Sequence, residues 1–183
     1  RDNSKMEFLC TPYFHWIWEA ICGYIFDNDY NHLKVYVPSP EWHSNMFIAG
    51  IEQRPDILFH DEDTLYILDA KYYNYHRNVP GWHDVVKQFY YRLTLMKALN
   101  SQTAKDELAN IRKIENVFVF PGDKEIGVQY LGYVDVKNVD ELGTVKAYLV
   151  DSLMAMRAYA LREESDFKMD LITELKGQKT EKR

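Results

Sequence analysis

Two aspartates and a lysine lie in a pattern that could hold a divalent cation. Asp69 and Lys71 are separated by one residue at the end of an apolar run, and Asp56 stands just before a second apolar run. Side chains alternate along a strand, so Asp69 and Lys71 would share one face, about 6–7 Å apart. Two carboxylates with the Ala70 carbonyl between them suit Mg²⁺, and the lysine could position a water or stabilise a phosphate. The same groups could instead form an ordinary salt bridge at the rim of a sheet.

The spacing of an acid, any residue and a lysine is not specific by itself. Segments 135–137 and 174–176 have the same spacing. Segment 135–137 has no Pro-Asp pair before it and no glutamine-bearing helix at the right distance after it, so we interpret it as a solvated strand end. The elements around Asp69 must therefore decide between the two interpretations.

The surrounding sequence predicts a hairpin. Residues 65–68 form an unbroken apolar run with aromatic and branched side chains, which is typical of a strand buried on both faces. Residues 57–59 predict the preceding strand, and the acidic residues 61–63 predict the turn. If the two strands pair through this turn, their outer ends meet, and Asp56 then lies near Asp69.

The rest of the chain alternates predicted helices and strands. Apolar residues at helical spacing predict a helix that starts at Thr11-Pro12, with Glu19 at the edge of its buried stripe. A helix over 82–99 would have two faces, a core face of Val85, Val86, Phe89, Leu93 and Met96, and a second face of Asp84, Gln88, Tyr91 and Leu95. We also expect strands over 33–37, 117–120 and 126–136, and helices over 104–114, 141–162 and 166–175. Helices on both sides of a buried mixed sheet predict an α/β sandwich.

The order of the motifs resembles one group of enzymes, the PD-(D/E)XK nucleases. Within that group the chain looks like the LlaJI-type restriction endonucleases, relatives of McrC subunits, and the likeness is densest over residues 54–95. The matching motifs, in order, are Pro55-Asp56, Asp69-Ala70-Lys71-Tyr72-Tyr73, Pro80-Gly81, Asp84, Lys87-Gln88 and Tyr91. The resemblance implies a restriction-endonuclease-like α/β fold, with a central mixed β-sheet flanked by helices. It also implies metal-dependent hydrolysis of DNA phosphodiester bonds in a restriction system that defends against phage and other foreign DNA.

The resemblance assigns the metal ligands. Asp56 and Asp69 would bind Mg²⁺, which Mn²⁺ could replace. The Ala70 carbonyl and Glu19 would complete the protein ligands of the ion.

The resemblance further implies catalytic and DNA-binding roles. Lys71 would position the attacking water or stabilise the transition state, and Gln88 would orient Lys71 or a phosphate oxygen. Contacts to DNA are expected after the hairpin, at His76, Arg77 and Tyr91, with Tyr90 as the alternative to Tyr91.

The composition is that of a folded domain rather than a disordered chain. The 183 residues are 46% hydrophobic, which is enough for a core. We expect a nuclease domain over 11–162, a disordered or linker segment over 1–10 and a charged C-terminal extension over 163–183. Cys10 and Cys22 lack the spacing of a zinc or redox site. We see no membrane span or secretory signal and expect a location in the bacterial cytoplasm.

The net charge of −6 argues against a surface built for non-specific DNA binding, since phosphate neutralisation needs clustered Lys and Arg. The chain starts at Arg1 without a methionine. We therefore expect a piece of a longer protein whose DNA recognition lies on a separate domain or subunit. By the resemblance, double-stranded DNA is the substrate, cutting both strands needs a dimer, and an AAA+ GTPase is a partner. The alternative is a catalytically inactive nuclease-fold domain that serves DNA or partner binding in a motor complex.

Overall fold

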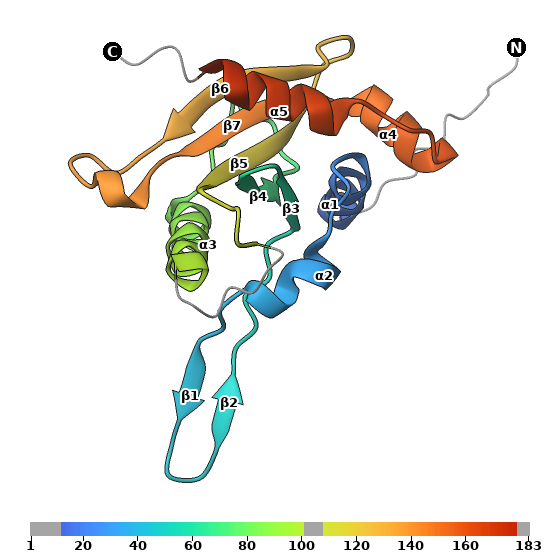
Figure 1. Cartoon of the computed structure of the whole chain (residues 1–183). Helices are drawn as coiled ribbons and strands as arrows, with labels where there is room; N and C mark the ends of the chain where they lie inside the picture. The colour runs from blue at the N-terminus through green and yellow to red at the C-terminus, as the bar shows by residue number, and fades with distance from the viewer. Residues whose placement is uncertain (1–11, 101–107, 179–183) are drawn as a thin grey trace, which may run out of the picture.

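The computed structural model describes residues 12–100 and 108–178, and its centre is a mixed five-stranded sheet (Figure 1). Its strands are β3 (Ile57–Asp61), β4 (Thr64–Ala70), β5 (Lys113–Gly122), β6 (Val128–Val134) and β7 (Val145–Asp151). They lie side by side in the order β3-β4-β5-β7-β6. The inner strands β4, β5 and β7 run parallel, and each edge strand runs antiparallel to its neighbour.

Helices cover both faces of this sheet. One face carries α1 (Phe14–Ile25), α4 (Ser152–Leu161) and α5 (Phe167–Gly177), whose buried side chains belong to a single core cluster. The other face carries the long helix α3 (Trp82–Asn100) and the short helix α2 (Tyr30–Leu33) (Figure 1). The predicted class, an α/β fold with a mixed central sheet flanked by helices, is confirmed.

The alternation of side chains along β4 decides which face carries the polar residues. Tyr66 and Leu68 pack with the core under α1, whereas Leu65 and Ile67 pack with the core under α2 and α3. Asp69 has the same parity as Leu65 and Ile67, so its side chain belongs to the α3 face.

The predicted central hairpin is confirmed. Strands β3 and β4 pair antiparallel with Ile57 opposite Leu68 and Asp61 opposite Thr64. Glu62 has a φ of 49°, and this left-handed conformation lets the chain reverse over two residues. The hairpin therefore closes at its acidic turn, and its open end joins the residues before Ile57 to those after Leu68.

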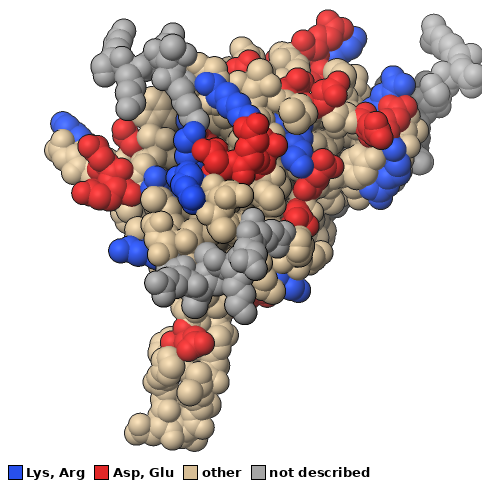
Figure 2. All heavy atoms as spheres, viewed as in Figure 1, with Lys and Arg blue, Asp and Glu red and all other residues tan. Residues whose placement is uncertain are grey.

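A second, isolated hairpin projects from the body, formed by β1 (Glu41–His43) and β2 (Ile48–Gly50) (Figure 1). All of its residues are exposed. Glu41 is its only Asp, Glu, Lys or Arg, and Figure 2 shows the arm as almost free of charged atoms beyond its base.

The predicted helix over 141–162 was wrong in its first half. Val145 and Leu149 have helical spacing, but they belong to β7, which lies between β5 and β6. A strand buried on both faces has no alternating polar residues to reveal it, so the four-residue spacing was misleading. The helix α4 starts only after Asp151, whose carboxylate caps it by accepting a hydrogen bond from the Met154 amide at 2.9 Å.

The predicted strand over 33–37 was also wrong. These residues end α2 and form a 3₁₀ turn over Lys34–Tyr36. Leu33 and Val37 are buried from that turn, so their apolar character reflects core packing rather than a strand.

The predicted helix over 104–114 lies partly outside the described residues, at 101–107. The part that the structure describes is not helical, because residues 108–112 form a loop and β5 starts at Lys113. The other predicted strands and helices are found: 117–120 lies in β5, 126–136 contains β6, 82–99 lies in α3 and 166–175 overlaps most of α5.

The core face expected for α3 needs correction. Val86 and Leu93 are exposed, whereas Gln88, Tyr91 and Leu95 are buried against the sheet. Apolar residues lie on several sides of this helix, so their spacing did not show which side faces the sheet.

Among the helices of the described residues, none combines the length and the hydrophobicity that a membrane crossing requires.

Candidate active site

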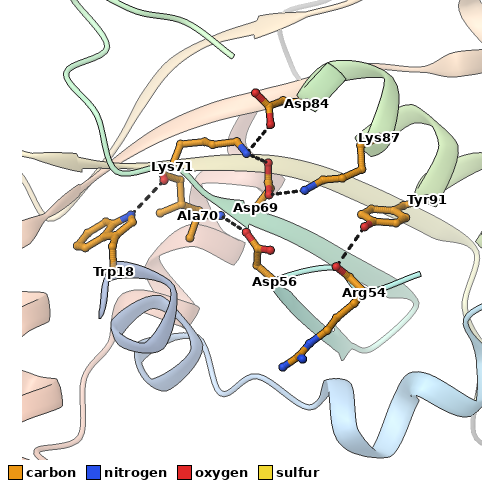
Figure 3. A network of polar contacts seen from close by, with 10 residues as sticks. Trp18, Arg54, Asp56, Asp69, Ala70, Lys71, Asp84, Lys87 and Tyr91 are labelled. Carbon is orange, nitrogen blue, oxygen red and sulfur yellow. Dashed lines mark hydrogen bonds and ion pairs between the residues drawn. The ribbon is translucent and has the colours of Figure 1, made fainter. Parts of the chain in front are cut away.

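The open end of the central hairpin brings Asp56 and Asp69 together (Figure 3). Asp56 Oδ2 accepts a hydrogen bond from the Ala70 amide at 3.0 Å, which holds the residue before β3 against the end of β4. The Asp69 side chain is only 1% exposed, and the two carboxyl groups are close enough to share a hydrogen bond. The predicted proximity of these two carboxylates is therefore present in the structure.

The side chain of Asn28, in the loop after α1, fixes the backbone of Asp56. Its amide nitrogen donates to the Asp56 carbonyl at 2.9 Å. Its oxygen accepts from the amides of Leu58 and Tyr30, both at 3.0 Å. One side chain thus ties the start of β3 to the loop between α1 and α2.

Lys71 lies beside Asp69, as the sequence predicts. Its Nζ is 2.7 Å from Asp69 Oδ2 and 2.7 Å from Asp84 Oδ1, and its side chain is 14% exposed. Its backbone amide donates to the Val119 carbonyl at 2.9 Å, which extends the pairing of β4 with β5 by one residue. The lysine is therefore turned into the site and held between two carboxylates (Figure 3).

A second lysine, Lys87, was not assigned a role from the sequence. It reaches from α3 and its Nζ is 3.3 Å from Asp69 Oδ1. Asp84, Lys87 and Tyr91 are spaced at i, i+3 and i+7, so they lie on one side of α3 and face the end of the hairpin (Figure 3). This acid–lysine pair, one turn apart at the start of the helix, is the signal by which the sequence could have revealed Lys87.

Gln88 lies one residue further along α3. It is completely buried, and neither atom of its side-chain amide makes a hydrogen bond within the described part of the chain. Its backbone carbonyl accepts a hydrogen bond from Asn116 of β5 at 2.9 Å. The structure thus brings Lys87, rather than the amide of Gln88, into contact with the acidic pair.

The two tyrosines of α3 differ in position. Tyr91 is buried, and its hydroxyl donates to the Arg54 carbonyl at 3.1 Å, while Tyr90 is exposed. The ring of Tyr91 also lies below the Lys87 ammonium, which is 6.0 Å from its centroid. In this structure Tyr91 therefore supports the segment before Asp56 and the position of Lys87.

Glu19 is placed differently from the two aspartates. It is partly exposed on α1, and the buried side of that helix packs on the opposite face of the sheet from α3. Within the described ranges no group of three or more His, Cys, Asp or Glu side chains is close enough to hold a metal ion. The structure therefore gathers two of the expected carboxylates, and Glu19 does not join them.

His76 and Arg77 lie in the exposed loop that follows β4. The loop is held by its own backbone, since the amides of Arg77 and Asn78 both donate to the Asn74 carbonyl at 3.0 Å. The His76 amide donates to the Asn74 side chain at 2.9 Å, and the His76 ring lies 3.9 Å from that of Tyr75.

Burial, the hydrogen bond to Asp69 and the negative charge of Asp69 together raise the pKa of Asp56 to about 8. For Asp69, burial opposes ionisation. The hydrogen bond to Asp56 and the charges of Lys71 and Lys87 outweigh it and lower the pKa of Asp69. With the pKa of Asp56 raised and that of Asp69 lowered, the pair retains one proton and carries one negative charge.

The environment also keeps Lys71 charged. Burial by itself would lower the pKa of the Lys71 ammonium, but Asp69 and Asp84 raise it above its usual value. A lysine in this state can donate hydrogen bonds or stabilise negative charge, and it cannot act as a base.

Two comparisons relate the chain to known proteins. A model of the LlaJI restriction endonuclease family matches residues 1–153. A curated relative, the "Type II restriction enzyme BsuMI component YdjA" of Bacillus subtilis (strain 168), is 27% identical over an alignment of 154 residues that covers 76% of this chain and 31% of the relative. The chain thus spans about a third of the length of that relative. The match covers the hairpin, Asp56, Asp69, Lys71 and α3, and on this basis the chain belongs to the LlaJI restriction endonuclease family.

Proposed function

We propose that this chain is the nuclease part of a restriction enzyme and hydrolyses DNA phosphodiester bonds with the help of a divalent metal ion. The observation that supports this most directly is the meeting of Asp56, Asp69 and Lys71 at the open end of a buried hairpin. An ordinary salt bridge would need only one carboxylate beside Lys71. Here the carboxyl group of Asp56 lies next to the buried carboxylate of Asp69, which pairs with Lys71.

The residues at this end fit a hard divalent cation. Two carboxylates lie side by side, and in the absence of a cation they retain a proton between them. Carboxylate oxygens are the ligands that Mg²⁺ and Mn²⁺ prefer. Asp56 and Asp69 would hold the ion, with the Ala70 carbonyl as the next candidate, and Glu19 would need to approach from the α1 side. When bound, the ion would lower the pKa of a water and polarise the scissile phosphate.

The chain's own residues would supply the remaining chemistry. Lys71 is charged and points into the site, so it would position the attacking water or stabilise the negative charge that develops on the phosphate. Asp84 would hold Lys71 in that orientation. Lys87 lies on the other side of Asp69 and would offer a second positive charge to the substrate. The buried and unsatisfied amide of Gln88 would orient a bound water or a phosphate oxygen only after a change of its side-chain position.

We further propose that other parts supply most of the affinity for DNA. The chain has a net charge of −6, and Figure 2 shows acidic and basic side chains interspersed over the face in view rather than segregated into a basic stripe. His76 and Arg77 would add contacts to the DNA backbone beside the site. The curated relative is a component of a restriction enzyme. We therefore propose that this chain works with a separate recognition domain or subunit, as a dimer, and with an AAA+ GTPase partner.

One observation favours the second candidate function, a catalytically inactive domain that binds DNA or a partner. Both oxygens of Asp69 are already paired with lysines, so the carboxylate is neutralised without a metal. In an inactive domain these pairs would be the final state of the site. In an active one Asp69 would have to exchange a lysine for the ion.

A cleavage experiment tests the proposal. Plasmid DNA is incubated with the protein and Mg²⁺ or Mn²⁺, alongside the substitutions Asp69→Ala and Lys71→Ala. We expect each to lower the cutting rate by at least about 100-fold. The exposed pair Asp135 and Lys137 has the same spacing and offers a matched control, since Asp135→Ala and Lys137→Ala should cut like the unchanged protein. Cutting that survives both site substitutions would remove the assignment, and no cutting by the unchanged protein with any partner would favour the inactive domain.

A further inference from the structure

A groove of about 340 Å³ opens beside the candidate active site. It is lined by Tyr73, Tyr75 and His76 from the loop after β4 and by the apolar side chains of Ile126 and Leu149. Gln129 of β6 also lines it. The cavity is therefore built at the end of the sheet where β4 leads directly from Asp69 into the loop.

The groove and the acidic pair lie on the same side of the sheet. Tyr72 turns towards α1, where its ring lies 4.5 Å from that of Phe14. Tyr73 turns the other way and its ring meets that of Phe120 edge-on at 5.5 Å, in the core under α3. Tyr73 lines the groove and follows Lys71 by two residues, so the groove begins beside the site on the α3 side of the sheet.

The chemistry of the lining favours one kind of ligand. Aromatic rings, apolar side chains and side-chain amides match the flat faces and polar edges of a nucleobase. None of the described lining residues is a lysine or an arginine, and Asp123 is acidic, so the groove does not suit a phosphate. Its volume is near the lower end of the range of small-ligand pockets, about 300–1,000 Å³, which admits a base and excludes a duplex.

We propose that this groove binds a nucleobase from the DNA strand whose phosphate lies at Asp69 and Lys71. The inference rests on the proposed nuclease function and adds to it a form of substrate, a strand that is single or locally unpaired next to the scissile phosphate. The rings of Tyr75 and His76, which lie 3.9 Å apart, would form the platform on which the base stacks. The edge of the base would meet Gln129.

Equilibrium binding tests the proposal without any cutting. Two fluorescein-labelled oligonucleotides of about 12 nucleotides are compared by anisotropy in EDTA, one of ordinary deoxynucleotides and one in which every base is replaced by an abasic sugar. We expect the ordinary strand to bind at least about tenfold more tightly, because only it has bases to stack. Tyr75→Ala, His76→Ala and Gln129→Ala should each reduce that ratio, with Tyr75→Ala close to abolishing it. Tyr133→Ala is the control, since Tyr133 is an exposed ring on the same strand as Gln129 and does not line the groove.

The outcomes separate the two proposals. Three results would overturn the groove assignment. They are equal affinity for the ordinary and the abasic strand, an affinity ratio that the groove variants leave unchanged, and no binding of either strand at about 100 µM protein. A ratio that the variants abolish supports it even if the protein never cuts plasmid DNA, in which case only the nuclease function fails. Plasmid cutting that depends on Asp69 together with equal affinity for the two strands leaves the nuclease function standing and removes the groove.

Discussion

The ammonium of Lys71 donates a hydrogen bond of 2.7 Å to the carboxylate of Asp84, and this contact joins the end of β4 to the first turn of α3. Lys71 is bound equally closely to Asp69. The position of Lys71 is therefore set by residues of both β4 and α3, and Asp84 on α3 is a positioning residue for Lys71.

Substitution of Asp84 tests this role. In Asp84→Asn the shape remains but the charge that holds Lys71 is lost, so we expect the turnover number for DNA cutting to fall by about tenfold with little change in the DNA concentration for half-maximal rate. Asp170→Asn is the matched control, because Asp170 also lies in the first turn of a helix but far from Lys71 in sequence and on α5. Equal turnover numbers for Asp84→Asn and Asp170→Asn would show that Asp84 does not act through the lysine.

Lys87 should compete with a metal ion for Asp69. In Lys87→Met the ammonium 3.3 Å from Asp69 Oδ1 is removed while the length of the side chain is kept. We expect Mn²⁺ to bind about fivefold more tightly, a change of about 1 kcal/mol, which is appropriate for a partly exposed ion pair. Calorimetric titration at about pH 9, where Asp56 is ionised, measures the affinity. Lys97→Met, an exposed lysine on the same helix, should leave it unchanged, and weaker binding by Lys87→Met would contradict the competition.

Metal affinity should depend on pH through Asp56. The pKa of Asp56 is raised to about 8, so below that pH an ion must displace a proton to use this carboxylate. The apparent affinity for Mn²⁺ should rise by up to about tenfold per pH unit between about pH 6 and 8 and level off above. Titrations across this range give the slope. An affinity that stays flat from pH 6 upward would mean that Asp56 is already ionised or takes no part.

The same proton should stabilise the metal-free fold. A carboxyl group whose pKa is raised on folding contributes stability that is complete below the unfolded value, about 3.9, and is lost as the pH rises through the folded value, about 8. Melting temperatures in EDTA should therefore fall between about pH 5 and 9. In Asp56→Asn the amide mimics the protonated acid, so the decline should be smaller and the variant should be at least about 1 kcal/mol more stable at the alkaline end. Parallel pH curves for the two proteins would show that the proton is not on Asp56.

Asn28 should matter for both stability and activity. Asn28→Ala removes three hydrogen bonds of 2.9–3.0 Å, two to the start of β3 and one from the Tyr30 amide. We expect a loss of about 1–3 kcal/mol in the free energy of unfolding, measured with urea, and a lower cutting rate because the backbone of Asp56 is released. Asn45→Ala, in the exposed hairpin of β1 and β2, is the control for the loss of an asparagine. An unchanged cutting rate in a destabilised Asn28→Ala protein would separate the fold from the site.

The hairpin and its acidic end could be predicted because their determinants are local. Asp56 and Asp69 are joined by one tight turn, and strand alternation then fixes the face of Asp69 and Lys71 without reference to the rest of the chain. For the same reason the two decoy segments could not be dismissed by spacing, and only the elements around them distinguish them from Asp69.

The rotation of α3 and the nature of β7 could not be predicted in the same way. A shift of one residue on a helix turns a side chain by about 100°, so the choice between Lys87 and Gln88 depends on how α3 packs on β5. The segment of β7 is largely apolar on both faces because its side chains enter the cores on both sides of the sheet, and the spacing of Val145 and Leu149 fits a helix equally well. The role of Glu19 as a metal ligand stays a prediction.

The charges of the paired site residues have a consequence for how the binding of an ion and the binding of DNA would be coupled. With its proton on Asp56, the metal-free cluster is electroneutral, because the ammonium groups of Lys71 and Lys87 cancel the carboxylates of Asp69 and Asp84. Exchange of that proton for a divalent ion leaves a surplus of one positive charge, which equals the negative charge of a single phosphodiester. Under the proposed function, electrostatic attraction for the DNA strand would therefore depend on the bound ion, and by thermodynamic reciprocity the bound strand would raise the affinity for the ion by the same factor.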